Sequence, residues 1–258
     1  VRKGVISSTV GTSGVVFAFA DTISLDPQGR VHTFCHSVPG KWHVMGVVLS
    51  AGGSLRWFRD ALCPAEKAIA TEIGKDPYEL ITEAAEAVAP GAEGLTFLPY
   101  LSGERTPHKD PYAKGAFIGL SLKHTRAHMA RAVLEGVAFA MRDSLEIMRE
   151  MGVAISQVRA SGGGARSALW RQIQADVNKT PLVTTNIDEG PAYGAALLAT
   201  VATGLYKSVE EACDAIIQVV EQCDPDSANG PVYDAWFKEY QEAYKALAPG
   251  FARTAKMV

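Results

Sequence analysis

The sequence SGGGARS at residues 161–167 follows a short apolar run and precedes an amphipathic helical pattern. Its three glycines, Gly162, Gly163 and Gly164, let a ligand approach bare backbone and leave the first helical N–H groups free to face it. A tight turn with Ser167 as an ordinary N-cap needs only one or two glycines. The third glycine therefore favours ligand approach, and the arrangement suits a nucleotide.

The pattern on both sides of this junction predicts an α/β fold. Predicted strands fall at 5–10, 15–20, 31–36, 42–50, 157–161 and 182–185. The first two should pair as a hairpin, and a long helix should run from Thr125, its N-cap, to a stop at Gly152. Antiparallel strands that feed into βα units give a mixed sheet with helices on both faces, the layout of a ribonuclease-H-like (actin-type ATPase) domain.

Residues 63–120 interrupt this alternation. Residues 63–94 read as Ala- and Glu-rich helices, and 102–119 as a loop rich in glycine, proline and charge, long enough to suggest function. The alternative for this loop is a solvated segment held by pairing among Glu104, Arg105 and Asp110. We expect one domain over residues 1–258, with 63–120 largely an insertion or loop region.

Composition excludes several classes of protein. Apolar residues make up 47% of the 258 residues and charged residues 21%, which predicts a packed soluble core. A net charge of -3 without a basic block argues against a nucleic-acid partner, and no apolar run is long enough to predict a membrane span. The cysteines form no CxxC pair, so reduced thiols in a cytoplasmic protein are expected at Cys35, Cys63, Cys213 and Cys223.

Two further glycine motifs lie before the middle of the chain. In GTSG at 11–14, glycines permit close backbone approach and two hydroxyls offer donors to phosphate, although an ordinary hairpin turn also explains the sequence. In AGGSLR at 51–56, a glycine pair separates a strand from a helix, and helix capping alone explains it. Neither motif identifies a ligand by itself.

Histidines and aromatic residues leave two alternatives open. His32 and His36 share one face of a predicted strand and His43 falls on its neighbour, so a metal-dependent hydrolase is conceivable. No carboxylate or cysteine cluster completes such a site, and we assign no metal ligand. The last helix carries an aromatic stripe that indicates either core packing or a homodimer contact: Tyr233, Trp236, Phe237, Tyr240 and Tyr244.

Taken together, these segments resemble the C-terminal domain of FGGY carbohydrate kinases over about residues 7–247. The most specific stretch, FLPYLSGERTPH at 97–108, continues as GAFIGL at 115–120 and looks like the xylulose kinase form of the family signature. RAVLEGV at 131–137 and SGGGARS at 161–167 match as well. Agreement at several separated motifs in the right order is more specific than any one motif.

The resemblance implies ATP- and Mg²⁺-dependent transfer of a γ-phosphoryl group to a sugar hydroxyl. D-xylulose, giving D-xylulose 5-phosphate, is the substrate it favours, and ribulose, a polyol or gluconate are the alternatives. The C-terminal domain would hold most of the nucleotide and an N-terminal domain most of the sugar. A non-catalytic module that binds a nucleotide or a partner protein is the alternative from another class.

The resemblance also implies roles for individual residues. Gly11 and Thr12, in the turn completed by Ser13 and Gly14, would approach the β- and γ-phosphates through backbone N–H and hydroxyl. Residues expected beside the nucleotide or against the adenosine are Gly52, Arg56, Gly162, Gly163, Gly164 and Ser167.

The family's general base is an aspartate just upstream of the Gly11 hairpin, and this chain begins after that point. We therefore expect this sequence to come from a larger protein, with the N-terminal sugar-binding domain absent. We expect no catalytic residue in the chain and no useful kinase activity from the chain alone.

Overall fold

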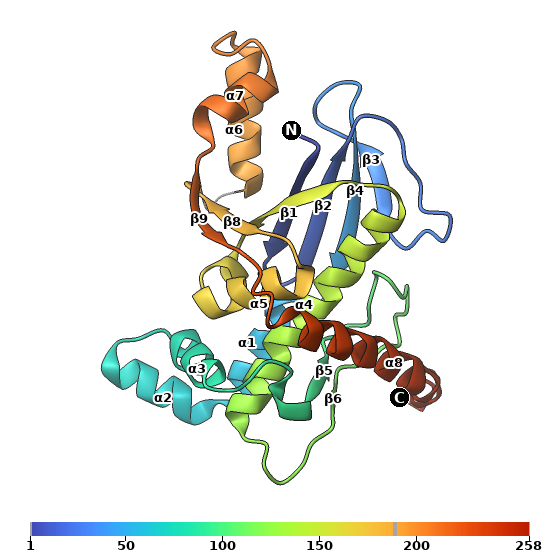
Figure 1. Cartoon of the computed structure of the whole chain (residues 1–258), viewed down its shortest axis with the longest axis vertical. Helices are drawn as coiled ribbons and strands as arrows, with labels where there is room; N and C mark the ends of the chain where they lie inside the picture. Colours follow the sequence, from blue (N-terminus) through green and yellow to red (C-terminus); the bar gives the residue numbers. More distant parts are fainter. Residues whose placement is uncertain (1, 188–189, 258) are drawn as a thin grey trace.

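The computed structural model describes residues 2–187 and 190–257, which are built around a seven-stranded sheet with the order β3-β4-β2-β1-β7-β8-β9 (Figure 1). Its strands are β1 (Gly4–Val10), β2 (Gly14–Ala20), β3 (His32–Cys35), β4 (Trp42–Val48), β7 (Ile155–Ser161), β8 (Leu182–Thr185) and β9 (Val219–Cys223). β1, β2, β4 and β3 pair antiparallel, whereas β7 and β8 run parallel to β1. The predicted α/β fold, with antiparallel N-terminal strands in a mixed sheet, is confirmed.

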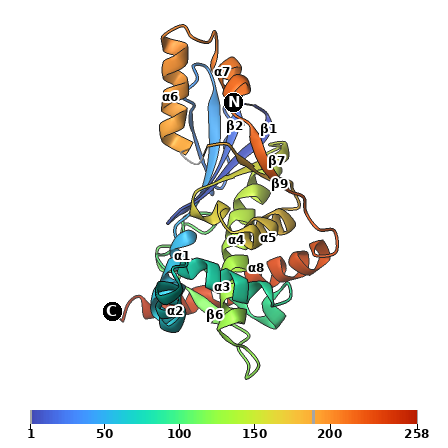
Figure 2. The same ribbon diagram turned by 90° about the vertical axis from the view of Figure 1, so that its left-hand side faces the viewer.

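The helices and 3-10 turns are α1 (Gly52–Leu62), α2 (Pro64–Ile73), α3 (Pro77–Glu86), η1 (Ala92–Gly94), α4 (Arg126–Glu150), η2 (Gly163–Ala165), α5 (Ala168–Asn178), α6 (Gly190–Ala202), α7 (Val209–Ile216) and α8 (Gly230–Thr254). Two views agree that α6 and α7 form one end of the molecule and α2 and α3 the other (Figures 1 and 2). Within the described residues, no helix is both long and apolar enough to cross a membrane.

Alternation along β1 explains why helices lie on both faces of the sheet. Ile6 and Val10 are buried on the face that α4 covers, whereas Val5 and Ser7 point the other way and lie beside α6. α4 is buried along most of its length, so it forms the centre of the core. Its predicted ends are confirmed, since Thr125 is the N-cap and Gly152 adopts φ +80° just beyond its last turn.

Residues 63–120 contain the helices predicted over 63–94 and, in addition, a short strand within the segment predicted as loop. They form α2, α3 and η1, followed by a two-stranded sheet of β5 (Thr96–Leu98) and β6 (Ala116–Ile118). The strand β6 lies inside the segment predicted as loop, and the edge strand β9 was not predicted either. Both are short, three and five residues, and their partners lie far away in sequence.

The aromatic stripe of α8 is core packing. Tyr233 and Tyr240 are fully buried, and the Tyr233 hydroxyl donates to the buried Glu135 carboxylate at 3.0 Å. The Tyr240 and Tyr100 hydroxyls lie 2.5 Å apart, which ties α8 to the segment after β5. Trp236 and Tyr244 are half-buried against the same core, and a homodimer stays a prediction.

The loop after Leu101 corrects one interpretation made from its charges. Glu104 is only 2% exposed and Thr106 is fully buried, so this part of the loop is not solvated. The Glu104 carboxylate accepts the backbone N–H groups of Leu49 at 3.0 Å and Arg105 at 2.7 Å, instead of pairing with basic side chains. Its connection to Asp110 is made by backbone alone, N to O at 2.8 Å. Glu104 therefore holds the loop against the end of β4.

Close packing between α4 and β5 gives a stability prediction. A Cβ atom on Gly136 would lie 2.2 Å from the Phe97 carbonyl oxygen, so Gly136→Ala should lower the free energy of unfolding by about 3 kcal/mol. Gly194→Ala in α6 is the control, because nothing lies within 4 Å of its Cβ position. It should stabilise by up to about 1 kcal/mol through helix propensity. Urea denaturation measures both, and equal stabilities would contradict this account of the packing.

Buried carboxyls predict how stability depends on pH. Burial raises the pKa of Glu104 from 4.5 to about 8 and that of Asp143 from 3.8 to about 7. In the unfolded chain these carboxyls ionise at lower pH than they do in the folded protein. Their contribution to stability is therefore full below the ordinary pKa values and is lost as pH rises towards the pKa values of the folded protein. Glu104→Gln keeps the acceptor oxygen but carries no charge, so its stability relative to the unmodified protein should increase with pH.

Urea denaturation at several pH values between about 5 and 8 measures this difference. Glu72→Gln, on the exposed surface of α2, is the control and should show no such trend. A Glu104→Gln stability difference that stays constant over this range would show that Glu104 is ionised in the folded protein.

Candidate functional site

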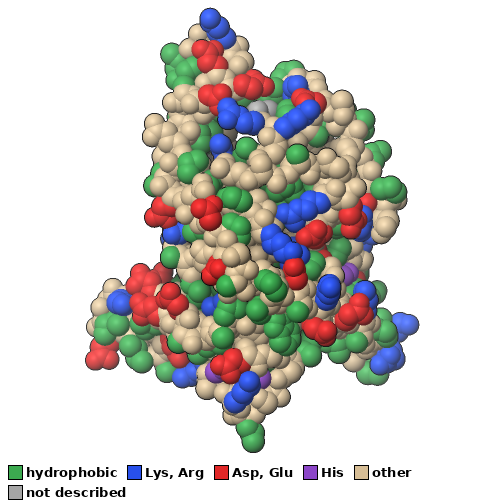
Figure 3. All heavy atoms as spheres, in the orientation of Figure 1, with side chains coloured by type: hydrophobic (Ala, Val, Ile, Leu, Met, Phe, Trp, Pro, Cys, Tyr) green, Lys and Arg blue, Asp and Glu red, His purple; other side chains and the backbone are tan. Residues whose placement is uncertain are grey.

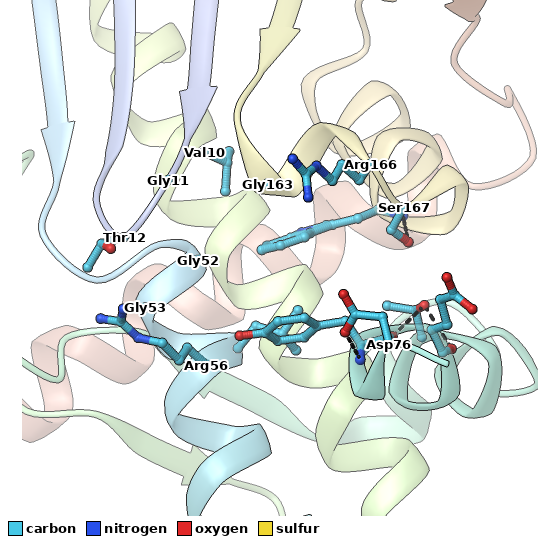
Figure 4. A pocket seen from close by; sticks show the side chains of 16 residues that line it. Val10, Gly11, Thr12, Gly52, Gly53, Arg56, Asp76, Gly163, Arg166 and Ser167 are labelled. Carbon is cyan, nitrogen blue, oxygen red and sulfur yellow. Dashed lines mark hydrogen bonds between the residues drawn. The ribbon is translucent and has the colours of Figure 1, made fainter. Parts of the chain in front are cut away.

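A pocket of about 540 Å³ opens at the carboxyl end of β1 (Figure 4). Four segments line it: the β1–β2 turn, the start of α1, the start of α3, and the glycine run before α5. The predicted site residues that line it are Gly11, Thr12, Gly52, Arg56, Gly163, Gly164 and Ser167. Residues far apart in the sequence are thus brought to one cavity.

The β1–β2 turn is locked to α1 by backbone hydrogen bonds. The Gly52 N–H donates to the Gly11 carbonyl at 2.8 Å, and the Gly53 N–H donates to the Thr12 carbonyl at 3.0 Å. A Cβ atom on Gly52 would lie 2.4 Å from the Gly11 oxygen, so this approach requires glycine. The Gly11 N–H itself donates to the Ser13 carbonyl at 3.0 Å. A phosphate contact through that N–H would require this bond to open.

Thr12 and Arg56 are the donors that remain available at this end of the pocket. Both are exposed, and among the described residues neither the Thr12 hydroxyl nor the Arg56 guanidinium has a hydrogen-bond or ion-pair partner. Figure 4 places them together, next to Gly53. A hydroxyl and an unpaired cation at one end suit an anionic group such as phosphate.

The three glycines of the run have different roles. Gly162 adopts φ +79°, and a Cβ atom there would lie 2.8 Å from the Val10 carbonyl oxygen. A Cβ atom on Gly164 would lie 2.5 Å from the Val10 side chain. At Gly163 the nearest such atom is 4.0 Å away. Gly162 and Gly164 are therefore needed for packing against β1, and Gly163 is the glycine that keeps the pocket wall open.

Three predicted residues lie outside the pocket lining. Gly14 faces α4, where a Cβ atom would lie 2.4 Å from the Met141 sulfur, so its role is close packing. Ser13 and Gly162 also do not line the cavity. Their predicted contacts with phosphate or adenosine have no support from this geometry.

Ser167 serves as helix cap and pocket wall at once. Its hydroxyl oxygen accepts the Trp170 N–H at 3.3 Å, which satisfies one of the free amides at the start of α5. Both Ser167 and Trp170 line the pocket, as does Arg166 between the glycine run and the cap. The capping interpretation of the sequence is confirmed, and a nucleotide contact stays a prediction.

Sequence reasoning missed the wall that α3 contributes: Asp76, Tyr78, Glu79 and Thr82. The signal for the helix itself was present. Asp76 precedes Pro77, and the Asp76 carboxylate accepts the Tyr78 N–H at 2.9 Å, which is an N-cap with proline in the first turn. Nothing in that pattern shows that the helix folds back over the glycine run.

The histidines do not form a metal centre in the described part of the chain, which holds no group of three or more His, Cys, Asp or Glu side chains able to bind a metal ion. The His43 ring instead stacks on Phe17, with 4.4 Å between ring centroids. The His36 ring lies edge-on to the His43 ring, with 6.0 Å between their centroids. Burial lowers the pKa of both imidazoles.

The face drawn in Figure 3 shows basic and acidic side chains interspersed.

Comparison with known proteins places this geometry in a family. Residues 6–203 match the description "FGGY family of carbohydrate kinases, C-terminal domain". The chain is 38% identical to a xylulose kinase from Staphylococcus epidermidis over 237 residues, 92% of this chain and 46% of that protein. It is also 38% identical to a gluconokinase from Bacillus subtilis over 218 residues, 84% of this chain and 42% of that protein.

Solved structures of FGGY-type sugar kinases have the same fold as this chain. A xylulose kinase from Rhodospirillum rubrum superposes with a TM-score of 0.84 at 34% identity, over 98% of this chain and 49% of that chain. A gluconate kinase from Lactobacillus acidophilus gives a TM-score of 0.85 at 28% identity, over 98% and 49%. The chain spans about half the length of the curated relatives it matches. It belongs to the FGGY family of carbohydrate kinases and corresponds to the C-terminal domain of that family.

Proposed function

We propose that the pocket at the end of β1 binds ATP with Mg²⁺, and that the whole enzyme transfers the γ-phosphoryl group to a sugar hydroxyl. One observation carries this proposal: the β1–β2 turn, α1 and the glycine run, all predicted separately, line a single cavity. Thr12 and Arg56 at one end would bind the phosphates, which lose water contacts on entry and gain a donor and a cation. Gly163 and Ser167 would lie against the nucleoside.

The same geometry gives this chain a partial role in the reaction. Two carboxylates line the pocket, those of Asp76, the N-cap of α3, and Glu79, in the first turn of α3, and Figure 4 shows Asp76 at the end opposite Thr12. No lining residue of the described chain is therefore placed to take a proton from a hydroxyl beside the γ-phosphate. Mg²⁺ would be held mainly by phosphate oxygens and water, as it prefers. We propose that this chain binds the donor but does not phosphorylate sugar alone.

D-xylulose is the substrate we propose, on the resemblance of the run at 97–108. Sequence identity does not decide it, because xylulose kinase and gluconokinase relatives are equally similar. Glu104 is buried, and the His108 ring stacks on Tyr244 with 3.5 Å between centroids, so these side chains of the run support the fold. Full-length protein assayed with ATP should show its highest kcat/KM with D-xylulose; a higher value with gluconate or ribulose would reassign the substrate.

Nucleotide binding by this chain is tested by thermal unfolding with Mg-ADP, Mg-ATP or D-xylulose. At a nucleotide concentration about 100 times Kd, mass action adds about 2.7 kcal/mol, which should raise Tm by about 5–10 °C. D-xylulose alone should have little effect. A large shift with D-xylulose and none with nucleotide would mean that this chain binds the sugar and not the nucleotide.

Gly163→Val localises the effect. A Cβ atom at this position would meet no atom closer than 4.0 Å, so Tm without ligand should hardly change, but the larger side chain would narrow the pocket and remove most of the nucleotide shift. Gly230→Val at the start of α8 is the matched control, because nothing lies within 4 Å of its Cβ position. A full nucleotide shift in Gly163→Val would place the nucleotide elsewhere.

A further inference from the structure

The end of the pocket farthest from Thr12 is built by two helices that face each other. On one side lie Ser167 and Trp170 from the start of α5, and on the other lie the first-turn residues of α3. Figure 4 shows Asp76 across the cavity from Ser167, with Thr12 and Arg56 at the opposite end. If the phosphates bind at Thr12, as proposed above, this far end receives the ribose and the base.

Two aromatic side chains make this end rigid. Trp170 is 3% exposed, and its indole N–H donates to the Leu134 carbonyl at 3.0 Å, so the ring is fixed by the core. The Arg59 guanidinium lies 4.7 Å from the centroid of the Tyr78 ring and holds it from the α1 side. Rings fixed in advance can contact a flat base without a further loss of side-chain entropy.

The same end carries two carboxylates with acceptor capacity to spare. One Asp76 oxygen accepts the Tyr78 N–H, which leaves the second oxygen for another donor. Glu79 is exposed and, among the described residues, its carboxylate has neither a hydrogen bond nor an ion pair. Arg56 lies at the other end, where phosphate would bind, whereas this end carries two carboxylates, with Arg166 as a cation of the lining beside Ser167. This distribution of charge favours the nucleotide orientation that puts the phosphates at Arg56 and the ribose at Asp76 and Glu79.

We propose that Asp76 and Glu79 accept hydrogen bonds from the 2′- and 3′-hydroxyls of the nucleotide ribose; this inference rests on the proposed function. A vicinal diol presents two neighbouring donors, which match two adjacent carboxylates. Adenine offers these groups a single amino donor, and its ring nitrogens are acceptors that a carboxylate would repel. The N-cap and first turn of α3 are therefore a determinant of specificity for a ribonucleotide.

The test measures the affinity of this chain for Mg-ADP, for its 2′,3′-dideoxy analogue and for the analogue that lacks the 6-amino group, by isothermal titration calorimetry. The unmodified chain should bind ADP at least about tenfold more tightly than the dideoxy analogue, as expected for hydrogen bonds to charged acceptors. Glu79→Ala and Asp76→Ser, which keeps a helix cap, should weaken ADP binding but leave the dideoxy analogue nearly unchanged. Glu83→Ala, one turn further along α3, is the matched control and should change neither.

Three results would overturn the inference. Equal affinity of the unmodified chain for ADP and the dideoxy analogue would leave the nucleotide site standing but remove the ribose contact. If Glu79→Ala bound ADP and the 6-deamino analogue equally well but still bound ADP more tightly than the dideoxy analogue, the carboxylates would lie at the base. Absence of binding for every nucleotide would overturn the proposed function and this inference with it.

Discussion

Direct backbone contact at the carboxyl end of β1 fixes the positions of the segments around it. On one side the Gly52 N–H meets the Gly11 carbonyl at 2.8 Å, and on the other Gly162 passes so near the Val10 carbonyl that a Cβ atom would lie 2.8 Å from it. A side chain at Gly52 or Gly162 would push α1 or the glycine run away. These contacts position two walls of the pocket, α1 and the glycine run, from the same strand, and α3 adds a further wall.

This constraint explains how a packing motif and a binding motif coincide. Gly162 and Gly164 pack against Val10, and of the three glycines only Gly163 leaves space in the pocket beside it. Likewise, the amides of Gly52 and Gly53 hold the β1–β2 turn, so the ligand-facing donors at that end are the Thr12 and Arg56 side chains. Backbone contacts shape the cavity at this end. Its binding groups are the side chains of Thr12 and Arg56, which have no other partner among the described residues.

The sequence predicted what local patterns encode. Alternating apolar residues gave the hairpin and the strands around the glycine run, and the caps at Thr125 and Gly152 gave the ends of α4. What depends on distant partners was missed. Charges near Glu104 suggested a solvated loop, because the amide of Leu49 that satisfies the carboxylate lies 55 positions earlier. The α3 wall was missed for the same reason: a cap shows where a helix starts but not what it faces.

The central claim is that one nucleotide contacts all four segments of the pocket at the same time. Hydrogen–deuterium exchange of this chain with and without Mg-ADP tests it directly. The account predicts slower exchange on ADP binding at the β1–β2 turn, the first turn of α1, the first turn of α3 and residues 163–167, with little change in α6 and α7. Protection confined to another surface, or absent at saturating ADP, would contradict it.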